Sequence, residues 1–363
     1  MQLSTRLIPG VLALVLISGC SSEKREPAGS AGGSTAAKAT SSGVDLTGAG
    51  ATFPQPIYYK WTSDYATKTG VKINYQSIGS GGGIRQISEQ TVDFGATDGP
   101  MKDDELAAAK GGPIMHFPTV LGAVVLAYNV PDVSQPLKLT GPVIADIFIG
   151  KITRWNDTRI ATLNPGVKLP AKDILVVHRS EGSGTTYVFT DYLAAVSPEW
   201  SKTVGKGKEV KWPTGVGAKG NEGVSGQVKQ TPYAIGYTEL AYVKQNKLQY
   251  ANIRNAAGQY VEPTIASISA AAEGAKLPPN TDFRVSIVNA SGAKAYPISS
   301  FTWLLVYRNQ ADSVKARKLK DFLRWAYSEG EQSAAALDYA PLPAGLNQRL
   351  IARLDSIRVG GKS

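Results

Sequence analysis

The sequence predicts an α/β fold divided into two domains. A short apolar run, a glycine-rich turn and a helix start follow one another three times, around Gly48, Gly79 and Gly182. This alternation of strands and helices is typical of α/β proteins with parallel strands. From about Val44 onward roughly 320 residues have a globular pattern, which is more than one hydrophobic core usually supports. Two domains are therefore expected.

The first unit runs from Leu46 to Pro54, and its final proline suits the first position of a helix, where the missing N–H costs nothing. Ile57, Trp61 and Tyr65 then fall four residues apart, which places them on one helix face. We expect a strand, a glycine turn and a helix whose apolar face packs on the core.

The second unit joins an extended run, Val71–Tyr75, to a glycine-rich turn, Ser77–Gly83, and a helix that starts at Ile84. A short strand is expected next, at Phe94–Thr97, and Asp98 lies in the turn that follows it. An aspartate at such a place usually forms the turn or caps a helix. The alternative is that its carboxylate faces a ligand.

The third unit carries the strongest signal for a binding site. Ile174–Val177 reads as a buried strand, and apolar residues at helical spacing follow from Tyr187. Ser183 or Thr185 can cap that helix. The free N–H groups and partial positive charge of a helix N-terminus can hold an anion, and Arg179 adds a permanent positive charge there. A capped turn beside a surface arginine is the alternative, but three such helix starts together suit one small, multiply charged anion.

Several segments resemble a known family. Ala145–Asp157 is similar to a segment typical of the substrate-binding proteins of the high-affinity phosphate ABC transporter. Other segments match that family in order: Gly48–Pro54, Gly79–Gly82, Val92–Asp98, Arg179–Thr185, Ala234–Tyr237 and Leu337–Ala340. The resemblance covers Leu46 to Leu354. It implies a two-lobed periplasmic binding protein-like (type II) fold, with two crossover strands as the hinge and phosphate in the cleft.

The resemblance also implies which residues contact phosphate, through backbone N–H groups, hydroxyls, one carboxylate and one guanidinium. These residues are Thr52, Phe53, Ser80, Asp98, Arg179, Ser183, Gly184 and Thr185. Asp98 would accept a hydrogen bond from the ligand. Glu181 stands where the family often carries aspartate, and it could hold Arg179 in an ion pair whose geometry the longer side chain changes.

Two apolar strands are long enough to cross between lobes, Val124–Val130 and Phe301–Tyr307. They divide the chain into lobe I, residues 44–122 and 298–363, and lobe II, residues 123–297.

Two helices are expected near the C-terminus. In the segment Val314–Tyr327 the apolar residues Leu319, Phe322 and Leu323 fall on one face, and lysines and arginines fall on the other. The apolar residues from Leu350 to Leu354 mark a last helix.

The N-terminus reads as an export signal. Residues 1–19 have a positive start and an apolar run too short to span a bilayer. The run ends at Cys20, the only cysteine, in a segment that resembles a bacterial lipobox. The resemblance implies cleavage before Cys20 and a diacylglycerol on its sulfur. Residues 20–43 contain no large apolar side chain, which predicts a flexible tether. A periplasmic, membrane-anchored lipoprotein of the cell envelope is therefore expected.

Net charge and composition limit the classes of molecule that the protein is expected to bind. The formal net charge of +10 favours anions. The basic residues are scattered and no nucleic-acid-binding motif occurs, so nucleic acid is not expected. The only histidines are His116 and His178, no cluster of metal ligands is present, and no cofactor is expected.

Three motifs point to other chemistry and are rejected. Gly215–Gly220 matches a dinucleotide fingerprint, but no clean strand precedes it and glycines continue to Gly226, where a helix should start. The Gly182–Gly184 turn lacks the lysine of a phosphate-binding loop and has Glu181 where a nucleophile elbow needs glycine. His178 could serve Ser183 as a base, but a strand histidine without a chemical role is the preferred interpretation.

Two functions from different classes remain. The preferred one is a monomeric phosphate-binding protein, not an enzyme, that delivers inorganic phosphate to the permease subunits of an ABC transporter. The alternative is an exported hydrolase of phosphate esters that uses the same anion pocket. It lacks a metal cluster and a convincing pair of nucleophile and base.

Overall fold

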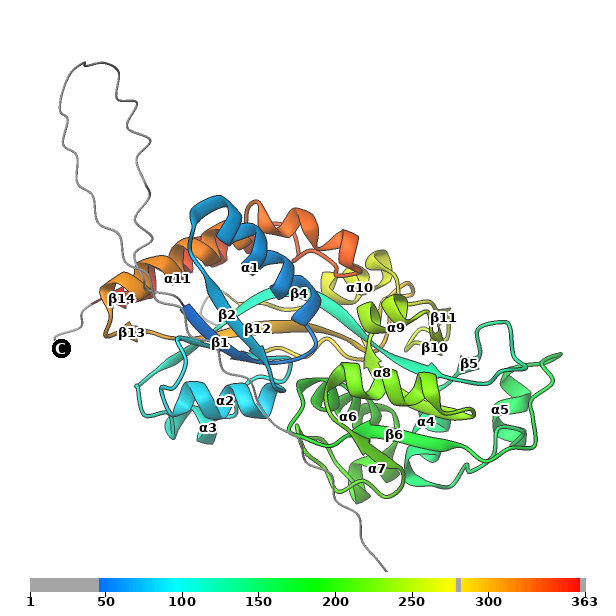
Figure 1. Cartoon of the computed structure of the whole chain (residues 1–363). Coiled ribbons are helices and arrows are strands. Elements are labelled where there is room, and N and C mark those ends of the chain that lie inside the picture. Colours follow the sequence, from blue (N-terminus) through cyan, green and yellow to red (C-terminus); the bar gives the residue numbers. More distant parts are fainter. Residues whose placement is uncertain (1–45, 279–281, 360–363) are drawn as a thin grey trace, which may run out of the picture. The chain divides into compact units, whose positions relative to one another are not determined.

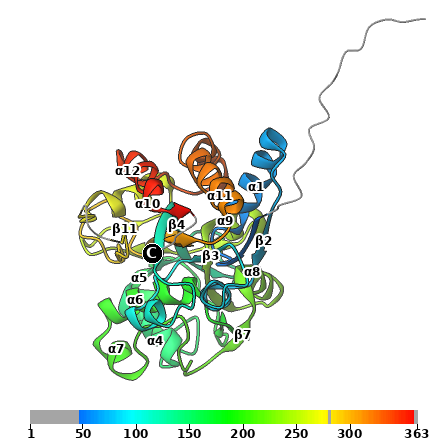
Figure 2. The same ribbon diagram turned by 90° about the vertical axis from the view of Figure 1, so that its left-hand side faces the viewer.

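The computed structural model describes residues 46–278 and 282–359. The expected signal segment, Cys20 and the tether lie outside these residues. Figures 1 and 2 show one mixed sheet with helices on both faces. Its strands run in the order β2-β1-β3-β12-β4-β8-β6-β7, with β9 also paired to β4. The bounds are β1 Leu46–Gly50, β2 Ile73–Ser77, β3 Phe94–Thr97, β4 Ile114–Tyr128, β6 Leu175–Arg179, β7 Val216–Ala218, β8 Ala234–Glu239, β9 Gln249–Tyr250 and β12 Ser299–Tyr307.

The long strand β4 organises the sheet. All fifteen of its residues are buried. It pairs antiparallel with β12 from Ile114 to Ala123 and then with β8 from Val124 to Tyr128. A register shift lies opposite Pro118, which has no N–H to give to the ladder. The strand expected at Val124–Val130 therefore exists but begins ten residues earlier and ends at Tyr128, and β12 contains the second expected strand.

The strands flanking β4 and β12 form two halves. The first half consists of β1, β2 and β3, and the second half of β6, β7 and β8; within each half the strands are parallel. The parallel strands of both halves point with their carboxyl ends toward the middle of β4. Thr97 ends β3 opposite Trp303, which pairs with Pro118, and Glu239 ends β8 opposite Val124. The loops that follow the strands of both halves therefore meet near the centre of the sheet.

Helices cover both faces of each half (Figure 1). In the first half α1 and α11 lie on one face and α2 on the other, and Figure 2 also shows α1 beside α11. The helix bounds are α1 Gln55–Thr69, α2 Ser80–Ser88, α3 Asp103–Ala107, α4 Gly141–Ile149, α5 Thr158–Leu163, α6 Gly184–Val196, α7 Pro198–Thr203, α8 Gly220–Gln230, α9 Leu240–Asn246, α10 Ile265–Glu273, α11 Ser313–Ala326 and α12 Leu346–Arg353. Among these helices none is long and apolar enough to cross a membrane.

Short elements complete the described chain. The strands β5 (Lys138–Leu139), β10 (Asn252–Arg254) and β11 (Tyr260–Val261) form a second sheet. The strands β13 (Asn309–Gln310) and β14 (Arg358–Val359) pair with each other. Short 3₁₀ turns follow α11 and α12 at Gly330–Ser333, Ala335–Leu337 and Leu354–Ser356.

The apolar faces expected from helical spacing are buried. On α1 the residues Ile57, Trp61 and Tyr65 lie in the core, and on α11 Leu319 and Phe322 do the same. The Trp61 indole N–H donates to the carbonyl of Gly330 at 2.7 Å, so the polar atom of this buried ring is satisfied. Amphipathic spacing thus predicted correctly which faces pack inward.

Two helix starts differ from the expectation. Helix α1 begins at Gln55, so Pro54 lies just before the helix. Helix α2 begins at Ser80, not at Ile84, and the glycines counted as a loop form its first turn. A Cβ on Gly83 would lie 2.5 Å from the Cα of Gly50. Gly83 therefore permits close packing of α2 on β1.

Candidate functional site

The structure brings together the residues that the sequence analysis assigns to ligand binding. They lie at the carboxyl ends of parallel strands. This is where open α/β sheets bind ligands, at the point where the strand order changes. Thr52 and Phe53 follow β1, Ser80 follows β2 and Asp98 follows β3. On the other side the segment Arg179–Thr185 spans the end of β6 and the start of α6.

The starts of α2 and α6 touch across the boundary between the two halves. The N–H of Gly81 donates to the carbonyl of Gly182 at 2.8 Å. A Cβ on Gly184 would lie 2.5 Å from both Asp98 Oδ2 and Ser80 Oγ. Only glycine fits at position 184. Its absent side chain brings the N–H groups at the start of α6 against the carboxylate and hydroxyl of the first half.

Asp98 is a buried acceptor. Its Oδ1 accepts a hydrogen bond from Thr302 Oγ1 at 2.8 Å, and its N–H donates to Ser80 Oγ at 3.3 Å. Burial raises the pKa of Asp98 to about 7, although the Thr302 hydrogen bond, the Arg179 charge and Ser80 all act to lower it. The carboxyl group can therefore gain or lose a proton near neutral pH. Its side chain bonds to β12 and caps none of the described helices.

Arg179 supplies the positive charge, and its side chain is 1% exposed. Its Nε donates to Glu181 Oε1 at 2.9 Å and its Nη2 contacts the same oxygen, while Nη1 donates to Thr185 Oγ1 at 3.2 Å. Glu181 Oε1 also accepts from the N–H of Gly220, whereas its buried Oε2 has no hydrogen-bond partner. Glu181 therefore binds Arg179 through one oxygen only.

Ser183, and not Thr185, caps α6. Its Oγ accepts from the N–H of Thr186 at 3.0 Å, and Thr185 lies inside the first turn. The hydroxyl of Thr186 shares a hydrogen bond with Tyr237, which also accepts from the N–H of Arg179 at 3.0 Å. The turn is held on both sides, so its N–H groups have a fixed direction.

Asn221 joins the two halves and was missed by the sequence reasoning. It is fully buried, and its Nδ2 donates to Thr52 Oγ1 at 2.8 Å and to Thr185 Oγ1 at 3.1 Å. Its Oδ1 accepts from Thr238 Oγ1 and from the N–H of Glu239. One amide thus connects the hydroxyls of two residues from opposite sides of the site.

The glycines from 215 to 226 predict a break in the helical pattern, and this expectation hides Asn221. That expectation was wrong. The strand β7 is followed directly by α8, which begins at Gly220 and contains Gly223 and Gly226. A strand, a glycine turn and a helix therefore occur at this point too, and the recurrence of that unit was the signal that could have found Asn221.

Buried tyrosines fix the backbone before α1. Tyr242 donates to the carbonyl of Thr52 at 2.5 Å, and Tyr339 donates to the carbonyl of Phe53 at 2.6 Å. The Phe53 side chain is fully buried in the core. What Phe53 can offer a ligand is therefore its N–H, which the tyrosines hold in place.

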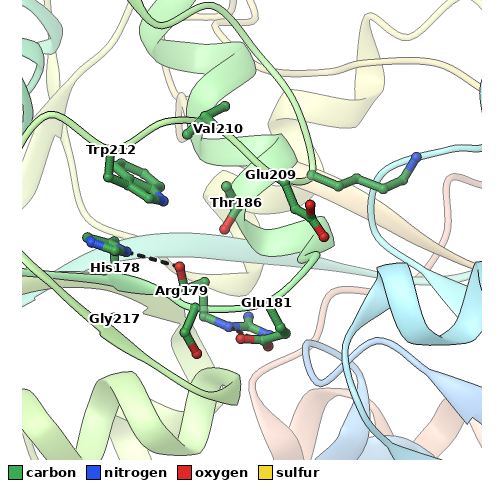
Figure 3. A pocket seen from close by; sticks show the side chains of 10 residues that line it. His178, Arg179, Glu181, Thr186, Glu209, Val210, Trp212 and Gly217 are labelled. Carbon is green, nitrogen blue, oxygen red and sulfur yellow. Dashed lines mark hydrogen bonds and ion pairs between the residues drawn. The ribbon is translucent and has the colours of Figure 1, made fainter.

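A pocket of about 360 Å³ adjoins this site, and Arg179 and Glu181 form part of its lining. Figure 3 shows His178 and Trp212 next to each other at its wall. Their rings stack with centroids 4.8 Å apart, and His178 Nδ1 lies 3.0 Å from the carbonyl of Arg179. Burial lowers the pKa of His178. These contacts engage His178 away from Ser183, whose hydroxyl caps α6.

The electrostatics of the site combine one cation with several dipoles. The charge of Arg179 is offset by Glu181, and α2, α6 and α8 begin at the same site, where the partial positive charge of a helix N-terminus adds to the positive potential. In the part of the chain that the structure describes, no three His, Cys, Asp or Glu side chains lie together as a metal site would require. The arrangement can hold an anion that offers one hydrogen to Asp98.

Solved structures support the fold. A phosphate-binding protein from Stenotrophomonas maltophilia superposes with a TM-score of 0.69 at 20% identity, over 85% of this chain and 94% of that chain. A high affinity periplasmic phosphate-binding protein bound with phosphate gives 0.67 at 22% identity, over 85% and 93%. These likenesses confirm the two-lobed, periplasmic binding protein-like α/β fold.

Sequence comparison identifies the family. A model described as a PBP superfamily domain matches residues 31–330. The phosphate-binding protein PstS of Pasteurella multocida is 47% identical over 315 residues, which cover 86% of this chain and 91% of that protein. PstS of Methanocaldococcus jannaschii is 43% identical over 316 residues, 81% of each. The chain therefore belongs to the PBP superfamily and, within it, to the family of the phosphate-binding proteins PstS.

Proposed function

We propose that this chain binds inorganic phosphate in the enclosed site between its two halves and delivers it to the permease subunits of an ABC transporter. The observation that carries the proposal is the buried Asp98 carboxylate placed opposite Arg179 and the start of α6. Phosphate near neutral pH is an anion that still carries a proton, so it needs many donors and one acceptor. The ligand shell would consist of Thr52, Phe53, Ser80, Asp98, Arg179, Ser183, Gly184 and Thr185, with Asn221 as an addition and Glu181 behind Arg179.

The relatives support binding and transport, not catalysis. They are named phosphate-binding proteins PstS. The hydrolase alternative has no support in this comparison. The pair it would need is also unformed, because His178 packs on Trp212 and Ser183 caps α6. We therefore place the chain among transport proteins and not among enzymes.

The hinge belongs in β4 and β12. The proposed lobes are residues 44–122 with 298–363, and residues 123–297. In support, β4 changes its partner from β12 to β8 between Ala123 and Val124. Opening about this point would part Thr52 from Asn221 and expose the ligand shell to solvent.

We further propose that the chain is a monomeric lipoprotein of the cell envelope, held in the membrane by acyl chains on Cys20. The lipobox-like segment and the single cysteine support this. More than one acyl chain is needed for stable anchoring, and the lipoprotein class provides that. Mass spectrometry of the native protein should find Cys20 at the N-terminus with an added lipid mass. An unmodified Cys20 in membrane-extracted material would contradict the anchor.

Calorimetry of ligand-free protein with phosphate, sulfate and arsenate tests the function. We expect tight 1:1 phosphate binding and no detectable heat with sulfate. A chromogenic phosphate ester should remain intact under the same conditions. Hydrolysis of the ester, or equal binding of phosphate and sulfate, would count against the proposal.

A further inference from the structure

Lys208 crosses the boundary between the two halves at the edge of the site. It lies in the second half, in the loop between α7 and β7. Its Nζ donates to the carbonyl of Pro100 at 2.9 Å and lies 3.0 Å from Glu105 Oε2 on α3. Pro100 follows Asp98 by two residues, and α3 follows β3. The ammonium group is therefore bound by the first half.

The backbone of Lys208 is tied to the ligand loop of the second half. Its carbonyl accepts from the N–H of Ser183 at 2.9 Å. One residue thus contacts the Ser183 turn through its main chain and the segment after Asp98 through its side chain. A substitution of the side chain removes the second contact and keeps the first.

The contact is shielded from solvent. The Lys208 side chain is 9% exposed and that of Glu105 is 30% exposed. Burial lowers the pKa of Lys208, and Glu105 acts in the opposite direction. Glu105 Oε2 also accepts from the N–H of Lys102 at 2.7 Å, so the partner of Lys208 is fixed at the start of α3. Removing one partner of a shielded charge pair costs more than removing one partner of an exposed surface pair.

We propose that Lys208 is a latch between the two halves that slows the release of the bound anion. The latch rests on the proposed function, because it concerns the rate at which phosphate leaves. Opening the site must withdraw the ammonium group from Pro100 and Glu105. The free energy needed to break these contacts raises the barrier to dissociation of the anion. Association begins from the open form, in which the latch is not made, and so depends on it much less.

Lys206 provides a matched control two residues away. Its Nζ binds Asp191 Oδ1 at 2.8 Å, and Asp191 lies on α6 in the same half. Like Lys208 it lies over the ring of Tyr187. Lys206→Met removes a charge from the same loop but no contact across the boundary. Lys208→Met keeps the length of the side chain and removes the latch.

The test measures the release of radiolabelled inorganic phosphate after dilution into excess unlabelled phosphate. The full chain, Lys208→Met, Lys206→Met, Glu105→Gln and the double variant Lys208→Met/Glu105→Gln are compared. We expect Lys208→Met to release phosphate roughly 5- to 20-fold faster than the parent, with an association rate within about twofold of it. Lys206→Met should match the parent, and the double variant should be no faster than Lys208→Met.

Three outcomes would overturn the latch. The first is that the parent binds phosphate and Lys208→Met releases phosphate at the same rate as the parent. The second is equal acceleration in Lys206→Met. The third is a fall in the thermal midpoint of ligand-free Lys208→Met as large as that of its phosphate complex, since this would indicate a structural role. A parent that binds no phosphate would instead refute the proposed function.

Discussion

The two halves contribute opposite chemistry to one site. The first half brings Asp98, Ser80 and Thr52, which are a carboxylate and two hydroxyls without a cation. The second half brings Arg179 and the capped start of α6, which are donors of positive character. Both sets follow parallel strands that run toward the middle of β4. Under the proposed function, the same strand–turn–helix unit would yield a discriminating side and an attracting side.

This division explains how one anion could be chosen over another. The second half alone would hold any small anion of suitable size. In the proposed site the Asp98 carboxylate would accept only from a ligand that carries a proton, because a fully ionised anion presents a lone pair to it. Thr302 fixes Oδ1 at 2.8 Å, which leaves Oδ2 beside Gly184 to meet the ligand. The first half would thus select an anion that carries a proton, and the second half would supply most of the affinity for the anion.

The largest expected effect comes from removing the discriminating acceptor. Asp98→Asn replaces the carboxylate by an amide that can donate to sulfate. A site built to pair with a ligand hydroxyl can reject an analogue without it by about 10⁴-fold. The ratio of phosphate to sulfate affinity should therefore fall by up to about 10⁴-fold. Calorimetry of both anions from pH 5 to 9 measures this ratio.

The pH series adds a second check on Asp98. Its pKa of about 7 means that the parent should reject sulfate most strongly above that pH, where Asp98 is ionised. Below it the protonated acid can donate. If Asp98→Asn excludes sulfate as well as the parent does, the filter lies elsewhere and Asp98 only shapes its turn.

The stability of the ligand-free protein should depend on pH through the same group. In the folded protein Asp98 has a pKa of about 7, above the 3.8 of an unperturbed aspartate. Between these values the folded state holds a proton that the unfolded chain has lost. The free energy of unfolding should then fall as pH rises through this range, by up to about 1.4 kcal/mol per pH unit.

Denaturant titrations at several pH values measure that slope. Glu239 is also buried with a raised pKa and contributes in the same direction. The difference between the parent and Asp98→Asn isolates Asp98. Equal slopes in both proteins would show that Asp98 is ionised in the folded state throughout the range.

Removing the charge of the attracting side should weaken every anion. Arg179→Ala loses a charge-assisted contact worth roughly 1.5–3 kcal/mol, or about tenfold to a hundredfold in phosphate affinity. Glu181→Gln should cost less, because Glu181 acts through Arg179. Arg159→Ala removes a surface arginine with 43% side-chain exposure and should leave affinity unchanged. Parent-like binding by Arg179→Ala would place the site elsewhere.

The smallest effect is expected at the amide that connects the halves. Asn221→Ala deletes the bonds to Thr52 and Thr185, and phosphate affinity should drop roughly three- to tenfold. Asn129→Ala is the control, since its amide bonds only to carbonyls at the end of α8. A loss of stability without a loss of affinity in Asn221→Ala would reduce this residue to a packing role.

Much of this arrangement follows from local patterns. Apolar spacing located α1 and α11, and the strand–glycine–helix units placed Ser80 and Arg179 at strand ends. The short strand expected at Phe94–Thr97 placed Asp98 in the turn that follows it. The boundaries at glycines were less predictable. Glycine normally opposes a helix, but on α2 it permits contact with β1, and this tertiary gain outweighs the local preference.

The contacts that complete the site depend on distant parts of the chain. Thr302 lies 204 residues from Asp98, and Asn221 lies 169 residues from Thr52. Lys208 reaches Glu105 across 103 residues. The repeated strand–turn–helix unit marks the place of Asn221. No periodicity or motif marks Thr302 or Lys208, because their partners are decided by how β4 and β12 bring the halves together. Their roles become visible only in the folded chain.

A crystal structure of the phosphate complex tests the central claim most directly. We predict one phosphate held between the halves, with an oxygen within hydrogen-bonding distance of Asp98 Oδ2 and others reached by Arg179 and the N–H groups that begin α6. A phosphate bound instead in the cavity that Lys102, Lys206 and Glu209 line would contradict this account. So would a complex in which Asp98 does not touch the anion.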